Sequence, residues 1–375
     1  MIGSLPHPRL SKLYLRICCF VLFFVAASAS FSGYYQKWHF AEADVPGDDS
    51  WASIESMLDG TAHRPSVYRR LLPDSANWID RVAPQAARNW LDQANSGDDP
   101  FLYAISASAT AHDPRYIFRY RVIYLETFLC ALMAVYAMYF VGEAVWPGSP
   151  GVLFAPVILI LLLPYIMTEG GFFYDYPELA FFALAVWIAL RFRWWWLIPI
   201  AALGTWNKET FLLFLVTMYP LLRRKADRFA PIWQTSALCA VSLAVLVPIR
   251  LHYAHNPASI GGATWMDYLN PEHLLWFSDE TYGMRMVTAS TLVPIALMVW
   301  TVVRGWKDLP PAVQQHARFA TAINLPLYIF FCNPGEMRNL SMLYVVLLLA
   351  VAANVNRRFG DREGELAPTE HGVAR

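Results

Sequence analysis

The sequence has little charge. Only 15% of its 375 residues are Asp, Glu, Lys or Arg, whereas 57% are hydrophobic and 15% are aromatic. A soluble domain usually carries about 25% charged residues, so this chain has too few to cover a globular surface in water. Its 29 basic and 29 acidic residues cancel to a formal net charge of zero. This balance argues against a nucleic-acid partner, because such proteins carry a basic footprint.

Cysteine is also scarce. The five cysteines are Cys18, Cys19, Cys130, Cys239 and Cys332, and nearly all of them fall inside apolar runs. The chain has no CxxC pair and no His/Cys cluster with the spacing of metal ligands. This pattern predicts small apolar packing residues, and it argues against a disulfide framework or a structural zinc site.

Long apolar runs take the place of the missing charge. A helix needs about 17 to 25 residues to cross the hydrocarbon core of a bilayer, and runs close to this length recur along the chain. They predict membrane-spanning helices near residues 13–31, 117–140, 152–168, 179–192, 232–247, 287–303, 319–331 and 342–353. The composition therefore indicates an integral membrane protein surrounded by lipid.

Basic residues indicate the direction in which these helices run. They lie before or at the start of the first run, in the short connectors and at the start of the tail: Arg9, Lys12, Arg16, Arg191, Arg193, Arg223, Arg224, Lys225, Arg228, Arg304, Lys307, Arg357 and Arg358. Since cytoplasmic connectors are enriched in Lys and Arg, we expect both termini to be cytoplasmic, in a bacterial inner (plasma) membrane. A cleavable signal peptide ending at Ala27-Ser28-Ala29 is the alternative for the first run. In either case, residues 34–116 form a long extracytoplasmic loop with short amphipathic helices.

Residues 194–222 form a run that is too long for one span. A single helix would measure about 44 Å at about 1.5 Å per residue, and it would carry Arg223 to the outer side. Two shorter helices that turn at Asn207-Lys208-Glu209 keep both basic flanks inside. We therefore predict an all-α polytopic transmembrane helical bundle of about ten helices that includes this short-helix hairpin. It spans residues 1–355, and residues 356–375 form a short cytoplasmic polar tail.

With this direction, the unusual polar residues gather on the outer side. The candidates are Asp44, Asp48, Asp49, Arg64, Tyr68, Arg69, Arg70, Asp175, Lys208, Glu209, Glu336 and Arg338. Charged side chains at membrane depth are costly unless they are paired or face water, so they suggest a functional cavity. Each also has a structural explanation, such as a solvated loop for the three aspartates or a Lys208–Glu209 pair across the hairpin turn. The arginines of 64–70 would equally suit a phosphate, because guanidinium groups bind its oxygens bidentately.

Three patches carry a resemblance to a known type of protein. They are GDDSWASIESMLDGTAHRPSVYRRLLP at 47–73, GTWNKETFLL at 204–213 and GEMRNLSMLYVVLLL at 335–349. Together with a first helix that runs outward into a long acidic loop, they resemble the GT-C-type polytopic membrane glycosyltransferase superfamily. More narrowly, they resemble uncharacterised bacterial membrane proteins grouped near that superfamily. The resemblance covers the layout of most of the chain, but the matching patches cover only about 50 residues.

The resemblance implies an inverting transfer of a sugar from a polyprenyl-phosphate-linked donor to an extracytoplasmic glycan or lipid. In such enzymes a carboxylate in the first outer loop is the catalytic base and helps to hold a divalent cation, Mg²⁺ or Mn²⁺. Asp44, Asp48 and Asp49 are the matching positions here, with Asp48 and Asp49 as the metal ligands if a metal binds. The chain has adjacent aspartates rather than an Asp-x-Asp or Glu-x-Asp motif.

The expected chemistry assigns a role to each group. Asp48 or Asp49 would take the proton of the acceptor hydroxyl. Arg64, Arg69, Arg70 and Lys208 would stabilise the phosphate that leaves. Asp44 is the further candidate for the base, and Tyr68, Asp175, Glu209, Glu336 and Arg338 would bind substrate. The alternatives are a transporter or flippase of lipid-linked saccharides and a non-catalytic membrane scaffold. Internal repeats with interrupted helices are common in transporters, and the sequence has no convincing repeat.

Overall fold

A computed structural model gives the fold. It describes residues 8–35, 37–38, 52–94, 113–166, 171–224, 229–258, 292–332 and 336–366, together with 272, 275, 281–284 and 287. Within these ranges the secondary structure is helical apart from isolated bridges, among them those of Arg64 with Ala258 and of Thr281 with Met284. The predicted all-α fold class is confirmed.

The helices follow the apolar runs of the sequence. The α-helices are α1 (Pro8–Tyr35), α2 (Ile54–Asp59), α3 (Leu71–Val82), α4 (Gln85–Ala94), α6 (Pro114–Val145), α7 (Pro150–Ile166), α8 (Asp175–Arg191), α9 (Leu197–Asn207), α10 (Phe211–Thr217), α11 (Tyr219–Arg223), α12 (Ala230–His252), α14 (Leu292–Gly305), α15 (Pro311–Phe331) and α16 (Tyr344–Leu366). Short 3-10 helices are η1 (Ser66–Tyr68), η3 (Trp194–Trp196), η6 (Trp306–Asp308) and η7 (Met337–Leu343). Helix α16 thus continues through the first part of the segment predicted as a polar tail.

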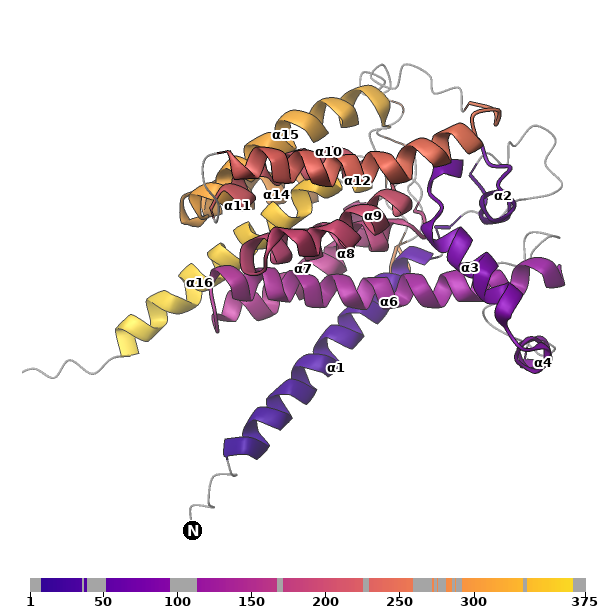
Figure 1. The fold of residues 1–375 in the computed structure, drawn as a ribbon. Coiled ribbons are helices and arrows are strands. Elements are labelled where there is room, and N and C mark those ends of the chain that lie inside the picture. The colour runs from indigo at the N-terminus through magenta and orange to yellow at the C-terminus, as the bar shows by residue number, and fades with distance from the viewer. Residues whose placement is uncertain are drawn as a thin grey trace, which may run out of the picture.

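The long helices lie side by side in a bundle, with α8 inside it (Figure 1). Nearly every side chain of α8 is buried, including its first two acidic residues, Asp175 and Glu178. Because the start of α8 lies inside the bundle, any charged residue there is surrounded by other helices. The candidate site lies at this buried start of α8.

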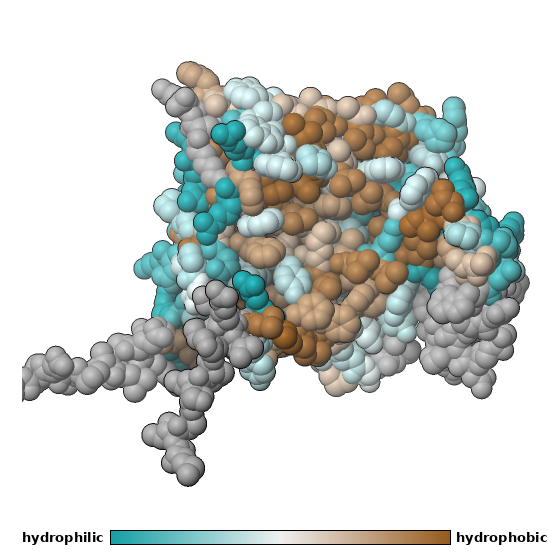
Figure 2. Space-filling model, turned by 60° about the horizontal axis from the view of Figure 1, so that its bottom comes forward, coloured by the Kyte–Doolittle hydropathy of each residue, from teal (hydrophilic) through white to brown (hydrophobic). Residues whose placement is uncertain are grey.

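The outside of the bundle is apolar. Leu243, Val247, Trp300 and Phe330 are among the large hydrophobic side chains that α12, α14 and α15 expose. Figure 2 shows hydrophobic side chains across the middle of one face, with hydrophilic ones along its left and right margins. Such a surface suits lipid, because a soluble protein rarely exposes contiguous apolar patches of more than a few hundred Å².

Four helices in the described part of the chain are long and apolar enough to cross a bilayer. They cover Leu13–Tyr35, Pro114–Val145, Ala230–His252 and Met337–Phe359. Two shorter apolar helical segments are Pro150–Ile166 and Phe211–Arg223. The chain is therefore an integral membrane protein with a helical bundle, whereas the predicted count of about ten spans stays a prediction.

The helix is interrupted where the polar triplet at 207–209 divides the long apolar run of residues 194–222. Helix α9 ends at Asn207 and α10 begins at Phe211. The Phe211 ring packs against Gly204, where an added Cβ would lie 2.6 Å from it. The chain also reverses, since Leu222 at the end of α11 lines the same surface depression as Trp194 before α9. The predicted hairpin break at residues 207–209 is confirmed.

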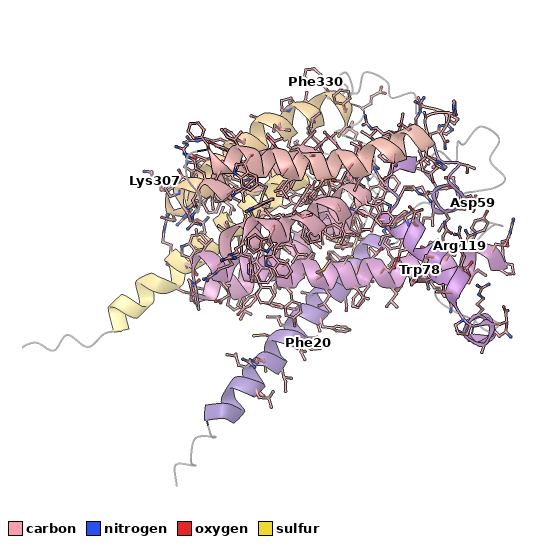
Figure 3. The ribbon with its side chains drawn as sticks, viewed as in Figure 1. Phe20, Asp59, Trp78, Arg119, Lys307 and Phe330 are labelled. Carbon is pink, nitrogen blue, oxygen red and sulfur yellow. The ribbon has the colours of Figure 1, made fainter. Side chains whose placement is uncertain are left out.

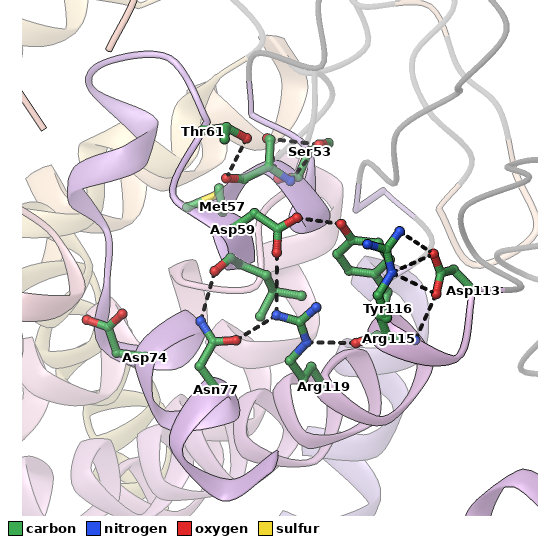
Figure 4. A network of polar contacts seen from close by, with 12 residues as sticks. Ser53, Met57, Asp59, Thr61, Asp74, Asn77, Asp113, Arg115, Tyr116 and Arg119 are labelled. Atoms are coloured by element: carbon green, nitrogen blue, oxygen red, sulfur yellow. Dashed lines mark hydrogen bonds and ion pairs between the residues drawn. The ribbon is translucent and has the colours of Figure 1, made fainter. Parts of the chain in front are cut away.

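A polar network fixes the short helices after α1 onto α6 (Figure 4). Arg119 Nη1 on α6 donates a hydrogen bond to Asn77 Oδ1 on α3 at 2.8 Å and lies 3.5 Å from Asp59 Oδ1 on α2. The Tyr116 hydroxyl donates to Asp59 Oδ2, and Asn77 Nδ2 donates to the Leu58 carbonyl at 2.8 Å. The network anchors α3, which directly follows Arg69 and Arg70 in the chain.

Basic residues of the connectors lie together at one end of the bundle. There, Arg191 Nη2 donates to the Glu143 carbonyl at 2.9 Å and Arg357 pairs with Asp308. Lys307 lies at this end, and Asp59 and Arg119 lie at the opposite end (Figure 3). The arrangement agrees with connectors that alternate between two sides of a membrane.

Candidate functional site

Segments that lie far apart in the sequence meet at the end of the bundle opposite Lys307. They bring together seven charged residues, which we name the charged cluster: Arg69, Asp175, Glu178, Lys208, Glu209, Glu336 and Arg338. The side chains of Lys208, Asp175, Glu178 and Arg338 are only 2–6% exposed. Burial of this many charges is costly unless each has partners, so the contacts of each side chain matter.

Lys208 and Glu178 form the innermost pair. Lys208 follows α9 in an extended conformation, and its backbone N–H closes the helix by bonding the Gly204 carbonyl at 2.9 Å. Its Nζ donates to Glu178 Oε2 at 2.7 Å and to Asn339 Oδ1 at 3.2 Å. The second oxygen of Glu178 accepts from Thr210 Oγ1 at 2.9 Å. Both oxygens of Glu178 are therefore engaged.

Asp175 lies one helical turn before Glu178 and is bound differently. Its Oδ2 accepts hydrogen bonds from the Tyr34 hydroxyl and, at 3.0 Å, from the Phe172 backbone N–H. Its Oδ1 has no hydrogen-bond partner and lies 3.8 Å from Lys208 Nζ. The position at the start of α8 suits an acidic side chain, because the N-terminus of a helix carries a partial positive charge.

Arg69 and Arg338 lie over two aromatic rings that stack on each other. The rings of Phe172 and Tyr174 are 5.0 Å apart. The Arg338 guanidinium lies 4.5 Å from the centre of Phe172, and that of Arg69 lies 4.5 Å from the centre of Tyr174. Arg338 also pairs with Glu336, and its Nε lies 3.9 Å from Asp175 Oδ2. Cation–π contacts of this kind favour the charged guanidinium.

The surroundings keep Arg69 charged. Burial alone would lower its pKa, but Tyr174 and Glu209 outweigh that effect and raise the pKa above its ordinary value. Arg69 Nη1 donates to the Tyr174 hydroxyl, and its Nη2 lies 3.6 Å from Glu209 Oε1. Burial raises the pKa of the Tyr174 hydroxyl, against the opposing effect of the nearby Arg69 and Arg338. The site thus presents a fixed cation next to a neutral hydroxyl.

The structure gathers six of the residues selected from the sequence, namely Arg69, Asp175, Lys208, Glu209, Glu336 and Arg338. Arg70 points elsewhere, because its Nε bonds Asp74 Oδ1 at 3.0 Å and its Nη1 bonds the Met57 carbonyl. The ring of Tyr68 lies beneath Arg250, with 5.5 Å between the guanidinium and the ring centre. Arg64 bonds the Pro257 carbonyl through its backbone N–H at 2.8 Å. A role for these three in ligand binding stays a prediction.

The three aspartates predicted as catalytic, Asp44, Asp48 and Asp49, lie outside the described residues. Their role as base, and that of Asp48 and Asp49 as metal ligands, therefore stays a prediction. Among the residues that the structure describes, no group of three or more His, Cys, Asp or Glu side chains is arranged to hold a metal ion. The four carboxylates of the charged cluster are instead paired with its lysine and arginines.

Some members of the site were not among the candidate catalytic or substrate-binding residues, although Glu178 is one of the unusual polar residues of the outer side. Tyr34, Tyr174, Glu178 and Asn339 all contact selected residues. Glu178 carried a usable signal, because residues three apart share a helix face and Asp175 had been selected. Tyr34 carried none, since an aromatic residue at the end of an apolar helix is ordinary in a membrane protein.

Comparison with protein-family models, curated proteins and solved structures finds no match. The most informative feature is a set of buried polar atoms without hydrogen-bond partners. Two are donors, Arg69 Nε and Arg338 Nη1, and three are acceptors, Asp175 Oδ1, Asn207 Oδ1 and Glu209 Oε2. Buried polar atoms are nearly always bonded, so this site has unused capacity for a ligand that both accepts and donates.

Proposed function

We propose that the protein is a GT-C-like, inverting membrane glycosyltransferase. It moves a sugar from a polyprenyl-phosphate donor to an extracytoplasmic glycan or lipid acceptor. The observation that carries this proposal is the mixture of unpaired donors and acceptors in the charged cluster. A ligand that satisfies both kinds of atom has anionic oxygens and hydroxyl groups close together, as a sugar phosphate does.

The charges of the cluster suit the leaving group of such a reaction. When the sugar departs, negative charge develops on the lipid phosphate, and cations placed beforehand stabilise it. Arg69 Nε and Arg338 Nη1 are the unpaired donors for its oxygens. Lys208 contributes a point charge next to them. The apolar exterior of the bundle would accommodate the polyprenyl tail.

The arrangement of the helices supports a place for this site at the outer leaflet. In our proposal, α1, α6, α7, α8, α9, α10 with α11, α12, α14, α15 and α16 each cross the bacterial inner membrane. The basic connectors and both termini then lie in the cytoplasm, and the charged cluster faces the other side. The base is drawn from Asp44, Asp48 and Asp49 of the first outer loop, with Mg²⁺ or Mn²⁺ as the cation if one is needed.

Ligand binding tests the proposal directly. We expect the full chain in lipid nanodiscs to bind farnesyl phosphate, a short polyprenyl phosphate, and not farnesol, which lacks the phosphate. Arg338→Gln should weaken this binding about 10- to 100-fold, since a hydrogen bond to a charged group contributes about 1.5–3 kcal/mol. Arg357→Gln is the matched control, because Arg357 pairs with Asp308 in a similar way at the other end of the bundle.

Turnover separates the proposed enzyme from its alternatives. Incubation with farnesyl-phosphate-linked sugars and membrane extract as acceptor should release farnesyl phosphate, detected by mass spectrometry. Binding without release would indicate a transporter or flippase instead. Equal affinity for farnesyl phosphate and farnesol would contradict any function that depends on a lipid phosphate, and would favour a scaffold.

A further inference from the structure

Two buried carboxylates on the same face of α8 differ in how their oxygens are used. Glu178 has both oxygens occupied, one by Lys208 Nζ at 2.7 Å and one by Thr210 Oγ1 at 2.9 Å. Asp175 has two hydrogen bonds on Oδ2 and none on Oδ1. Since the two side chains are equally buried, at 3% exposed, burial does not explain the difference. Both oxygens of Glu178 are hydrogen-bonded, whereas Asp175 Oδ1 has only an ion pair with Lys208 at 3.8 Å and no hydrogen bond.

The Asp175 oxygen that lacks a hydrogen bond, Oδ1, has a fixed direction. The Tyr34 hydroxyl from α1 and the Phe172 backbone N–H both hold Oδ2, and rotation of the carboxylate would break these bonds. A buried acceptor without a partner costs about 1–3 kcal/mol, and more when it is charged. A site that keeps such an atom in a set orientation is prepared for a ligand that donates to it.

The neighbours of this oxygen restrict what that donor can be. Lys208 Nζ lies 3.8 Å from Oδ1, and Arg338 Nε lies 3.9 Å from Oδ2. In the proposed function these cations hold the phosphate of the donor substrate. A carboxylate repels phosphate oxygens, so the ligand group that meets Oδ1 must be a hydroxyl close to the phosphate. In a sugar joined to phosphate through its anomeric carbon, the nearest hydroxyl is the one on the adjacent carbon, C2.

We propose that Asp175 Oδ1 accepts a hydrogen bond from the C2 hydroxyl of the donor sugar, and that it selects donors with a free hydroxyl at that position. This inference rests on the proposed function and narrows its substrate class. Asp175 is then a specificity-determining residue, and Glu178 positions Lys208. A site built to bond a hydroxyl rejects analogues that lack it, because the buried acceptor is left unpaired.

Three ligands that differ only at C2 test the proposal: the mannosyl and glucosyl farnesyl phosphates, which are C2 epimers, and their common 2-deoxy analogue. We expect the wild-type chain in nanodiscs to bind one of the two epimers at least about 10-fold more tightly than the 2-deoxy compound. In Asp175→Asn the ratio of the affinity for this epimer to the affinity for the 2-deoxy compound should fall to about 1–3. Affinity for farnesyl phosphate, which has no sugar, should not fall in the same variant, because the change removes a negative charge next to Lys208 and Arg338.

Two further variants keep the test decisive. Tyr34→Phe removes one of the bonds on Oδ2 and should reduce the ratio even if Asp175→Asn does not fold. Glu178→Gln should weaken binding of all three sugar ligands together, because it frees Lys208, and should leave the ratio between them unchanged.

Three results would overturn the assignment. In the first, the wild-type chain binds the 2-deoxy compound as tightly as both epimers. In the second, Asp175→Asn keeps the wild-type ratio of affinities for the preferred epimer and the 2-deoxy compound, with turnover unchanged. In the third, Asp175→Asn keeps this ratio but loses turnover at saturating donor. The last result would identify Asp175 as the proton acceptor instead. Failure of the proposed function has a different signature, namely equal binding of farnesyl phosphate and farnesol by the wild-type chain.

Discussion

Lys208 illustrates how single residues are held inside this bundle. Its side chain is 2% exposed, and its ammonium group has Glu178, Asn339 and Asp175 around it. It does not pair with Glu209, its neighbour in sequence, which bonds Arg69 instead. The sequence left open a structural alternative in which Lys208 pairs with Glu209 across the hairpin turn. This pair does not form. Lys208 is extended, and successive side chains of an extended chain point to opposite sides.

A substitution series at this pair should reveal its buried character. Lys208→Met leaves Glu178 charged and without its main partner, and we expect a loss of about 3–5 kcal/mol in the free energy of unfolding. The double variant Lys208→Met/Glu178→Met should be more stable than either single variant, because it removes the uncompensated charge. Unfolding of each purified variant in detergent measures these free energies of unfolding. A double variant less stable than both singles would contradict the pairing.

Among the elements, the α9–α10 hairpin depends on close approach at one glycine. A Cβ on Gly204 would lie 2.6 Å from the Phe211 ring, which itself stacks on Phe182 with 5.4 Å between ring centres. The ring cannot move away freely, because it is buried on both sides. The hairpin therefore requires a residue without a side chain where its two helices meet.

Gly204→Ala should destabilise the protein by about 1–3 kcal/mol, as overpacking of a tight interior does. Leu203→Ala is the control, since Leu203 is an exposed neighbour on the same helix. We expect its effect to stay within about 0.5 kcal/mol. Thermal unfolding of the two variants in the same detergent compares them. An equal effect of both changes would show that the contact with Phe211 does not limit packing.

The start of α6 offers a test by pH. Asp113 is its N-cap, where Oδ1 accepts from the Arg115 backbone N–H at 2.9 Å. The side chain and backbone N–H of Arg115 hold the pKa of Asp113 below its ordinary value. A lowered pKa means that the cap stabilises the helix at neutral pH, and that this contribution is lost as the pH falls through the folded-state value.

Hydrogen exchange in the first turn of α6 measures this contribution. We expect protection of that turn, after correction for intrinsic rates, to decrease between pH 6 and pH 3. Asp113→Asn keeps a capping side chain that does not titrate, so its protection should vary less with pH. Asp113→Ala should lose about 0.5–2 kcal/mol of local stability at pH 6. Identical pH dependence in the wild type and Asp113→Asn would exclude the carboxylate as its source.

For the whole molecule, we expect the two ends of the bundle to face opposite sides of the membrane, so that a membrane-impermeant reagent reaches only one of them. Gln85 on α4 and Lys307 on η6 are both exposed. In a background without the native cysteines, Gln85→Cys should react with a membrane-impermeant maleimide on intact cells. Lys307→Cys should react only after the membrane is opened. Reaction of both positions from the same side would contradict a bundle whose ends face opposite compartments, and the reverse pattern would place the charged cluster in the cytoplasm.

The class of the molecule could be predicted because it depends on local composition. Apolar runs specify helices for lipid, whatever the helices later contact. The hairpin break was predictable for the same reason, because Asn207-Lys208-Glu209 interrupts an apolar run. The direction that the basic connectors indicate stays a prediction. The partners of the charged residues were harder to predict from the sequence. Arg70 resembled Arg69 in the sequence, yet it bonds Asp74 four residues later on α3.

The sequence by itself determined that this chain is a helical membrane protein and which residues carry charge at unusual positions, since both follow from the free energy of transferring side chains into lipid. Only the tertiary structure decided which of these charges meet. Asp175, Lys208 and Arg338 come from three separate segments, and their contact depends on how the helices pack. The same packing leaves Asp175 Oδ1 without a hydrogen bond while both oxygens of Glu178 have one, because a carboxylate oxygen is hydrogen-bonded only where another segment brings a donor to it.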